Sequence, residues 1–443
     1  MEKIKHAFFN PFYFKIIATV IFVVSTTKYT GFIYDYGVYA IVIWGGSIFW
    51  INTFFKKFKL KKIDYLIYIF ILGYFVTIIT NSDDGIVVQA FVLLCSCMYF
   101  YSFFSVDRYT LEDFRRESYV IMFIIVAITF IFLLISYGMF VYDMISGTNN
   151  TYNIHGGSSI QFMGIYNGIA TQACISGISM LSSLSLISIA IRKDIRLKKL
   201  FIIFNVTNFV MQDIAVTISY TTAGILSTGM ALMVGLVLII LDKGKQEKRK
   251  VTNVILAVLI AVIICLVNYM VTDYAGSKFI NALAENKQET SELQADEAIS
   301  GIYNSNGRMP IWEEGIKQWK EQPLFGNGYG DFYVRIDLDG DDGSRYIEYR
   351  NMHSGYLELL NSCGILGFLS IMSFGMYYIL KFFISLFKTE GRYRYMGTAM
   401  IIIYACLYAA INQLFILDRS INVLILCIFM GLGRFDFHKT QEN

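Results

Sequence analysis

The chain has 443 residues, of which 56% are apolar and only 16% are charged. Its apolar residues fall in runs of about 20, which match a bilayer core of ~30 Å at a helical rise of ~1.5 Å per residue. This composition excludes an ordinary soluble protein. The net charge of +3 is too small to indicate a nucleic-acid partner. Seven cysteines lie in or beside apolar runs, so we expect neither a disulfide framework nor a zinc site.

Twelve apolar runs predict an all-α integral membrane protein with twelve transmembrane helices. The first run begins near Phe12 and lacks a small-residue cleavage site behind it, so we interpret it as a first span rather than a signal peptide. The predicted spans cover 12–30, 33–54, 63–80, 86–104, 119–142, 161–191, 198–218, 221–241, 251–272, 355–386, 394–416 and 419–435.

Basic residues divide unevenly between the two sides of this predicted bundle. By our count, 25 of the 37 lysines and arginines fall on the side of the N-terminus. The short connections on the other side contribute only Lys28 and Arg419. Because basic loops stay in the cytoplasm, this pattern predicts a multi-pass protein with both termini cytoplasmic. Richness in Ile, Phe, Tyr, Lys and Asn is typical of AT-rich bacterial genomes, so we expect a bacterial plasma membrane.

One long polar segment interrupts the apolar runs and divides the chain into three parts: 1–272, 273–353 and 354–443. The middle part is an extracytoplasmic loop between the ninth and tenth spans. Pro310 at the first position and Pro323 at the end predict a short helix within it. Trp312, Ile316 and Trp319 share one face of that helix. It either lies on the outer membrane surface or packs the loop against the bundle.

Several polar residues lie toward the outer ends of neighbouring spans. Polar groups inside a span are costly, so they bond to other helices or line a water-filled cavity. Their common depth favours an outward-open polar cavity covered by the long loop, although interhelical hydrogen bonding is the simpler reading for any one of them. These residues are Gln161, Asn167, Gln172, Gln212, Asp213, Thr221 and Thr222.

His353 is the main candidate for chemistry among the four histidines. It directly precedes the apolar run 355–384, which places it at a helix N-terminus. The positive end of the helix dipole opposes protonation there, and a neutral imidazole can accept a proton from a hydroxyl. The alternative is a capping or interfacial histidine. Of the others, His6 and His438 are predicted to be cytoplasmic and His155 extracytoplasmic.

Three further patterns stand in the long loop. Gly326, Gly328 and Gly330 alternate with other residues, without the lysine of a phosphate-binding loop, and indicate a tight turn or close backbone approach. Arg308 follows a turn-like run and could grip a phosphate in a bidentate manner, or simply lie on the surface. Asp337 to Glu348 imitates calcium-loop spacing, but Asp342 replaces the required glycine, which favours a solvated acidic loop and no metal.

Together these motifs resemble the O-antigen ligase/polymerase superfamily of bacterial membrane glycosyltransferases. The pattern begins Gly307-Arg308-x-x-x-Trp312 and continues as Pro323-Leu324-Phe325-Gly326-Asn327-Gly328-Tyr329-Gly330-Asp331-Phe332. It ends with His353-Ser354-x-Tyr356-Leu357-Glu358-x-Leu360 and Cys363-Gly364-Ile365-Leu366-Gly367. The resemblance covers roughly 60 residues, the number of spans and the position of the loop.

The resemblance implies a sugar chain carried on undecaprenyl pyrophosphate and transferred to a hydroxyl without metal or cofactor. By position, His353 matches the catalytic histidine and Arg308 a loop arginine that contacts pyrophosphate. Substrate contacts would involve Gly326, Gly328, Gly330, Phe332, Trp312, Arg350, Glu358, Thr222 and Asp213. Two positions depart from the family: Ser354 replaces an asparagine, and 221–224 lack a second arginine. Arg335, Arg345, Arg350 or Lys278 could substitute for it.

The first functional hypothesis is a polymerase of lipid-linked repeat units for a capsular or other surface polysaccharide. A ligase that uses the same chemistry on another acceptor, such as a lipid core sugar or a wall polymer, is the second. A transporter or flippase of lipid-linked oligosaccharides is the third; it would need no one-sided loop with Arg308 and His353. Expected partners are the lipid-linked substrates, the bilayer, and chain-length regulator and flippase proteins.

Overall fold

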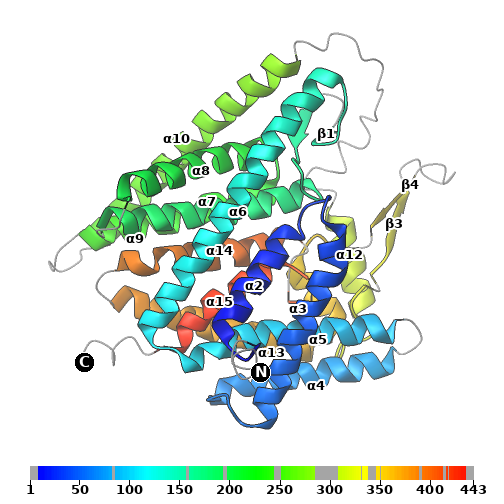
Figure 1. Cartoon of the computed structure of the whole chain (residues 1–443). Helices are drawn as coiled ribbons and strands as arrows, with labels where there is room; N and C mark the ends of the chain where they lie inside the picture. The colour runs from blue at the N-terminus through cyan, green and yellow to red at the C-terminus, as the bar shows by residue number, and fades with distance from the viewer. Residues whose placement is uncertain are drawn as a thin grey trace.

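The computed structural model describes residues 8–81, 85–155, 159–192, 197–243, 251–284, 308–330, 332–337, 346–349, 351–388, 392–412, 416–417 and 419–435. The structural statements below concern these residues. They form an all-α integral membrane protein with two short β-hairpins (Figure 1). The helices coincide with the apolar runs because a helix satisfies its own backbone hydrogen bonds inside a bilayer.

The membrane helices occupy the predicted runs in chain order. Ten are long and apolar enough to cross a membrane, and two shorter apolar helices, α2 and the pair α15–η8, stand at the first and last predicted spans. The count of twelve spans stays a prediction. The helices are α2 (Pro11–Val24), η1 (Ile33–Gly37), α3 (Val38–Phe54), η2 (Lys62–Asp64), α4 (Tyr65–Thr80), α5 (Ile86–Phe104), η3 (Ser105–Arg108), α6 (Leu111–Ser146), α7 (Ile169–Arg192), α8 (Lys198–Ile218), α9 (Thr222–Lys243), α10 (Val251–Ala284), α12 (Arg308–Trp319), α13 (Gly355–Lys388), η7 (Arg392–Tyr395), α14 (Met396–Ile411), α15 (Ile421–Met430) and η8 (Gly431–Arg434).

Two antiparallel hairpins lie outside the helices. Strand β1 (Tyr152–His155) pairs with β2 (Ser159–Phe162), and β3 (Val334–Asp337) pairs with β4 (Tyr346–Tyr349). Both hairpins and α12 lie at the same end of the bundle, which we call the loop end (right side of Figure 1). The loop end is the side that the basic residues predict to be extracytoplasmic.

Several boundaries differ from the prediction: α6 begins before the predicted span and α10 continues beyond it, and three others have a local cause. The sixth span begins at Ile169 rather than 161, because the residues before it pair with β1 or turn back toward Thr26. Helix α2 ends at Val24 rather than 30. The hydroxyls of Ser25 and Thr26, which follow it, donate to backbone carbonyls of its last turn. Helix α12 begins at Arg308, so Pro310 is its third residue and not its first.

Helix α7 is the centre of one half of the bundle, with α6, α8, α9 and α14 around it (Figure 1). In its most apolar stretch 83% of the residues are buried, whereas the figure is 17% for α10 at the edge of the bundle. Small residues allow this close packing: Gly177 lies against the ring of Tyr404, and Ser185 lies against Gly397. Helices α3, α4, α5 and α13 form the other half, and α15 lies between the halves (Figure 1).

At the end opposite the loop end, Arg434 fastens the C-terminal segment to the bundle. Its guanidinium is buried and binds Asp107 at 2.7 Å and Asp64 at 3.0 Å. Tyr378 of α13 donates to Asp64 at 2.6 Å, and Lys59 accepts from Arg434 through its carbonyl. A buried charge is tolerated when it is paired and fully hydrogen-bonded, and this network meets that condition. It joins α13 and η8 to the start of α4 and the end of α5.

Candidate functional site

Arg308 and His353 lie near each other at the loop end, one on α12 and the other in the turn before α13. Arg308 is the first residue of α12, and His353 stands two residues before α13. Both side chains are partly buried. Burial lowers the pKa of His353, and the neighbouring positive charge of Arg308 lowers it further. Both effects favour the neutral imidazole, and the role of His353 as a base stays a prediction.

The end of α14 holds both elements in place. Arg308 donates from Nη1 to the carbonyl of Ile411 at 3.2 Å. The backbone N–H of Gly355, the first residue of α13, donates to the carbonyl of the adjacent Asn412 at 2.9 Å. Burial lowers the pKa of Arg308, yet a guanidinium stays charged at any physiological pH. One helix terminus therefore positions the cation and the imidazole relative to each other.

His353 has a constrained backbone. Its φ of +49° lies in the left-handed region, which costs an ordinary residue roughly 1–2 kcal/mol. The side chain of Asn351 accepts from its backbone N–H at 3.3 Å, and the ring of Tyr349 meets the imidazole edge to face at a centroid distance of 6.1 Å. A surface residue under no constraint would relax from this conformation, so the turn fixes where the imidazole lies.

A small apolar cluster lies beneath this turn. It consists of Ile311 of α12, Phe332 and Met352, each less than 4% exposed. Trp312 donates from Nε1 to the carbonyl of Met352 at 2.9 Å. Phe332 and Trp312, predicted to contact substrate, are thus placed where they pack the loop against the residue before His353. Their part in substrate binding stays a prediction.

The first turn of α13 is buried immediately beyond His353. Ser354 and Glu358 are each 5% exposed, and the backbone N–H of Glu358 donates to the carbonyl of Ser354 at 3.0 Å. Glu358 is therefore carried one helical turn below the imidazole. The resemblance assigns it to substrate contact, and the structure buries it in the first turn of α13.

The glycine motif docks onto a break in α13. Gly364 has φ +61° and ψ −175°, a conformation essentially restricted to glycine. The N–H groups after the break donate to the loop, with Ile365 bonding the carbonyl of Pro323 at 2.8 Å. In return, Asn327 and Gly328 donate to the carbonyls of Asn361 and Ser362, at 2.8 and 3.1 Å. The loop thus replaces hydrogen bonds that the broken helix loses.

Gly326 meets Gly364 backbone to backbone. Its φ is +80°, and a Cβ there would lie 2.6 Å from the carbonyl oxygen of Asn361. A Cβ on Gly364 would lie 2.5 Å from the backbone nitrogen of Phe325. Gly328 is buried. Gly330 is exposed, and a Cβ at this position would have no described atom within 4 Å. Of the three motif glycines, Gly326 has the clearest packing reason to be glycine.

Polar side chains at the end of α4 and in α5 also bind the backbone of the glycine motif. The sequence interpretation missed these residues. Gln89 donates to the carbonyl of Tyr329 at 2.6 Å and accepts from its N–H at 3.0 Å. Thr77 donates to the carbonyl of Phe325 at 2.5 Å, and Asn81 donates to that of Gly326 at 3.3 Å. The available signal was Gln89 itself, a buried polar residue inside an apolar run.

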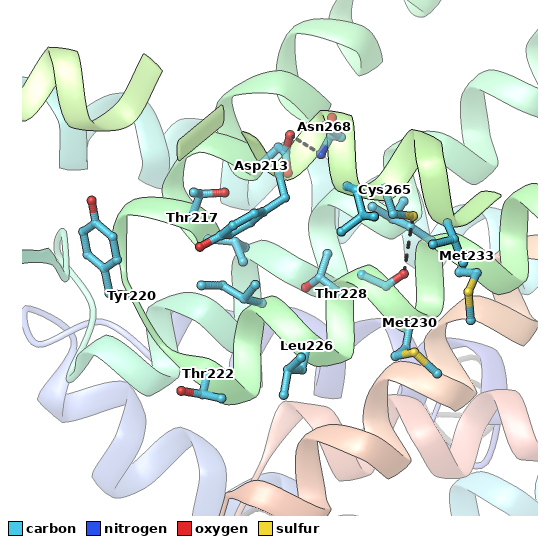
Figure 2. Close-up of a pocket in the computed structure, with 17 residues that line it drawn as sticks. Asp213, Thr217, Tyr220, Thr222, Leu226, Thr228, Met230, Met233, Cys265 and Asn268 are labelled. Atoms are coloured by element: carbon cyan, nitrogen blue, oxygen red, sulfur yellow. Dashed lines mark hydrogen bonds between the residues drawn. The ribbon is translucent and has the colours of Figure 1, made fainter. Parts of the chain in front are cut away.

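Asp213 and Thr222 line one cavity of about 630 Å³ between α8, α9 and α10. Figure 2 shows Tyr220 and Thr222 at one end, where α8 passes into α9, and Met230 and Met233 at the other. Asn268 donates to Asp213 at 2.9 Å in the wall. The walls are otherwise mostly apolar, so this cavity suits a lipid chain better than free sugar.

The remaining predicted polar residues bond within the protein. Gln172 donates to Ser176 at 2.9 Å, and Gln212 donates to Asn208 at 3.2 Å. Asn167 bonds the segment after α2, and Gln161 lies in β2. None of these four lines the cavity with Asp213. For Gln172, Gln212 and Asn167 the structure supports the alternative of hydrogen bonding inside the bundle, and the hydroxyl of Thr221 likewise bonds that of Ser219.

Several predicted basic and acidic residues fall at the limits of the described chain. Arg350 and Arg345 lie outside the described residues, and only the backbone of Arg335 is described, in β3. Lys278 is exposed on α10, with its ammonium 5.7 Å from the ring centroid of Tyr274. The two ends of the calcium-like segment belong to the arms of hairpin β3–β4, whereas 338–345 lie outside the described residues.

A comparison with protein families matches residues 207–372 to a model described as O-Antigen ligase. The matched region runs from α8 into α13 and includes Arg308, the glycine motif, His353 and Gly364. No curated protein matches the chain.

Proposed function

We propose that this chain, a member of the O-antigen ligase/polymerase superfamily, polymerises lipid-linked oligosaccharide repeat units at the outer face of a bacterial plasma membrane. The family supports a membrane enzyme of the glycosyltransferase type. One observation carries the proposal further: Arg308 and His353 meet at a single junction of α12, α13 and α14. The pair provides a fixed cation for an anionic leaving group and a neutral base for an acceptor hydroxyl.

The proposed reaction moves a growing chain from its undecaprenyl pyrophosphate to a new lipid-linked unit. The acceptor oxygen forms a bond to the anomeric carbon of the donor sugar, and the bond from that carbon to the pyrophosphate oxygen breaks. The electron pair leaves with the lipid pyrophosphate, whose charge Arg308 offsets. The hydroxyl proton passes to an imidazole nitrogen of His353 and from there to water. Binding both substrates beside Arg308 and His353 would hold the acceptor hydroxyl and the anomeric carbon in line, which makes the transfer effectively unimolecular.

The cavity between α8, α9 and α10 supports a lipid-linked substrate. Its rim at Tyr220 and Thr222 lies where α8 passes into α9, on the side predicted to be extracytoplasmic, and its apolar interior reaches Met233. An isoprenoid chain of one substrate would occupy this interior, while its pyrophosphate stays at the loop end. Asp213 and Thr222 would then act as wall and rim of a lipid site rather than as sugar ligands.

A ligase is the second candidate, because the matching family model is itself described as a ligase. Ligase and polymerase share the same donor and differ in the acceptor. Purified protein reconstituted with a synthetic lipid-linked repeat unit separates them: a ladder of products indicates a polymerase, and no ladder without an added acceptor indicates a ligase. Chain-length regulator and flippase proteins remain proposed partners.

The decisive variants are His353→Ala and Arg308→Lys. Loss of a general base typically costs on the order of a hundred- to ten-thousandfold in rate, so His353→Ala should leave a trace of product at normal protein level. Arg308→Lys keeps the charge but loses the planar fork, so activity should fall, and further still for Arg308→Ala. His155→Ala, in hairpin β1–β2, is the matched control, because it removes a histidine of another predicted outer loop. Normal polymer from His353→Ala would refute the mechanism, and a transporter would show that result.

A further inference from the structure

A second cavity lies at the end of the bundle opposite the loop end. It is lined by residues of α3, α4 and their connection, whereas α12, α13 and α14 form the candidate site. It measures about 450 Å³, within the range of roughly 300–1,000 Å³ typical of small-ligand sites. The end of α3, the connection to α4 and the start of α4 enclose it. Its lining residues are Asn52, Thr53, Lys56, Phe58, Leu60, Tyr65 and Tyr68.

The polar groups in this cavity are mainly hydrogen-bond donors. Asn52 is 1% exposed, and its Oδ1 accepts from Arg108 at 2.9 Å, which leaves Nδ2 as a donor. That Nδ2 has no hydrogen-bond partner within the described part of the chain. Lys56 adds an ammonium, and Thr53 and Tyr68 add hydroxyls 3.4 Å apart. A buried donor without a partner is costly, and a ligand with acceptor oxygens would satisfy it.

Lys56 occupies a backbone position that favours glycine. Helix α3 ends in a reversal in which Lys57 donates to the carbonyl of Asn52 at 2.8 Å and Lys56 donates to that of Thr53 at 3.1 Å. Between them Lys56 adopts φ +49°, the left-handed conformation where glycine usually ends a helix. Lysine is disfavoured there, so its presence indicates a use for the side chain that glycine could not supply.

The surroundings are basic and lie at a membrane interface. Residues 52–64 contain five lysines and one acidic residue, Asp64, which is already bound to Arg434. Phe54, Phe55 and Tyr65 beside the cavity are 75%, 72% and 58% exposed. Exposed aromatic rings next to lysines are typical of the headgroup level of a bilayer. These rings favour a phosphate that belongs to a lipid over one dissolved in water.

The geometry points to a binding site for one anionic phospholipid of the cytoplasmic leaflet, with its phosphate between Lys56 and Asn52. The inference is independent of the proposed polymerase chemistry and rests on the predicted orientation of the bundle. The lipid phosphate would accept from the Nδ2 of Asn52 and the ammonium of Lys56, and its acyl chains would run along Tyr65 and Phe54. Such a lipid would brace the turn that joins α3 to α4.

Two substitutions at Lys56 separate binding from folding. Lys56→Gly removes the charge and relieves the left-handed strain, and Lys56→Asn is the second residue type that tolerates this backbone. Neither should lower the melting temperature of the purified protein in detergent without added lipid. Lys57→Ala is the matched control, since it removes an equal charge from a neighbour that does not line the cavity.

The measurement is the rise in melting temperature during titration with phosphatidylglycerol, phosphatidylcholine or inorganic phosphate. We expect phosphatidylglycerol alone to stabilise the unmodified protein. Its affinity should fall about tenfold in both Lys56 variants, the loss expected for one hydrogen bond to a charged group, and stay near normal in Lys57→Ala. Equal stabilisation by phosphatidylcholine or by inorganic phosphate would overturn the proposal. An equal loss in Lys57→Ala would do the same, because it would show diffuse attraction rather than a site.

Discussion

Replacing Gly364 with alanine tests whether the contact between the glycine motif and the break in α13, which we call the clamp, stabilises the fold. The new Cβ would lie 2.5 Å from the backbone nitrogen of Phe325 and would also overlap the carbonyl of Leu324. Both atoms belong to backbone that cannot rotate away. A residue forced into this φ/ψ region costs about 1–3 kcal/mol, and overpacking in a close-packed interior adds about 1–3 kcal/mol. Together these effects, about 2–6 kcal/mol, are a large fraction of the stability of an ordinary domain, about 5–15 kcal/mol.

The assay is thermal unfolding of the purified protein in detergent, read by the fluorescence of its tryptophans. Trp312 and Trp319 lie in α12 and report on the loop end. Gly375→Ala is the matched control, because it changes a glycine of the same helix with open space around a built Cβ. We expect that control to hold or gain stability, as alanine favours a helix. If Gly364→Ala and Gly375→Ala melt at the same temperature, the contact between the loop and the break in α13 does not stabilise the protein, and this prediction is wrong.

Two further predictions concern the base and the orientation of the chain. The pKa of His353 is lowered by burial and by Arg308, so the imidazole stays neutral to a pH below its ordinary value of about 6.5. The acid limb of kcat/KM should therefore lie below that pH, and Arg308→Gln should move it upward; a limb unchanged in Arg308→Gln would show that the two groups are not coupled. For orientation, a cysteine at Glu289 should react with an impermeant thiol reagent in intact cells, whereas one at Lys248 should not. The unmodified chain gives the background, since five of its seven cysteines are buried. Labelling at Lys248 alone would place the candidate site in the cytoplasm.

The membrane helices were predictable because one physical requirement dominates them. A run of about 20 apolar residues has few alternatives to a helix in a bilayer, and each predicted run contains a helix. Helices α6 and α10 extend past the apolar runs, and two other errors fall where residues bond locally. Ser25 and Thr26 end α2 early, and the segment before Ile169 pairs with β1 instead of extending α7. Hydropathy carries no information about those bonds.

The candidate site was predictable only in part, because its contacts join distant residues. Periodicity alone could not bring Arg308 beside His353, and the resemblance named both without giving their geometry. The contact of Gly326 with Gly364 joins a polar loop to the interior of a membrane helix, and neither glycine is unusual on its own. The hydrogen bonds of Gln89 to Tyr329 span 240 residues. Such contacts follow from the assembled fold and from no local pattern.

The coupling of Arg308 to His353 suggests an order of events for the proposed reaction. In the chain alone, the guanidinium opposes a proton on the imidazole, so the base is neutral but weak. A bound pyrophosphate would offset the charge of Arg308 and thereby make the imidazole a stronger base. The acceptor hydroxyl would then be deprotonated only after the donor is in place. The bond of Arg308 to the carbonyl of Ile411 would hold the two groups at a short separation, which such an order needs because electrostatic coupling weakens as the separation grows.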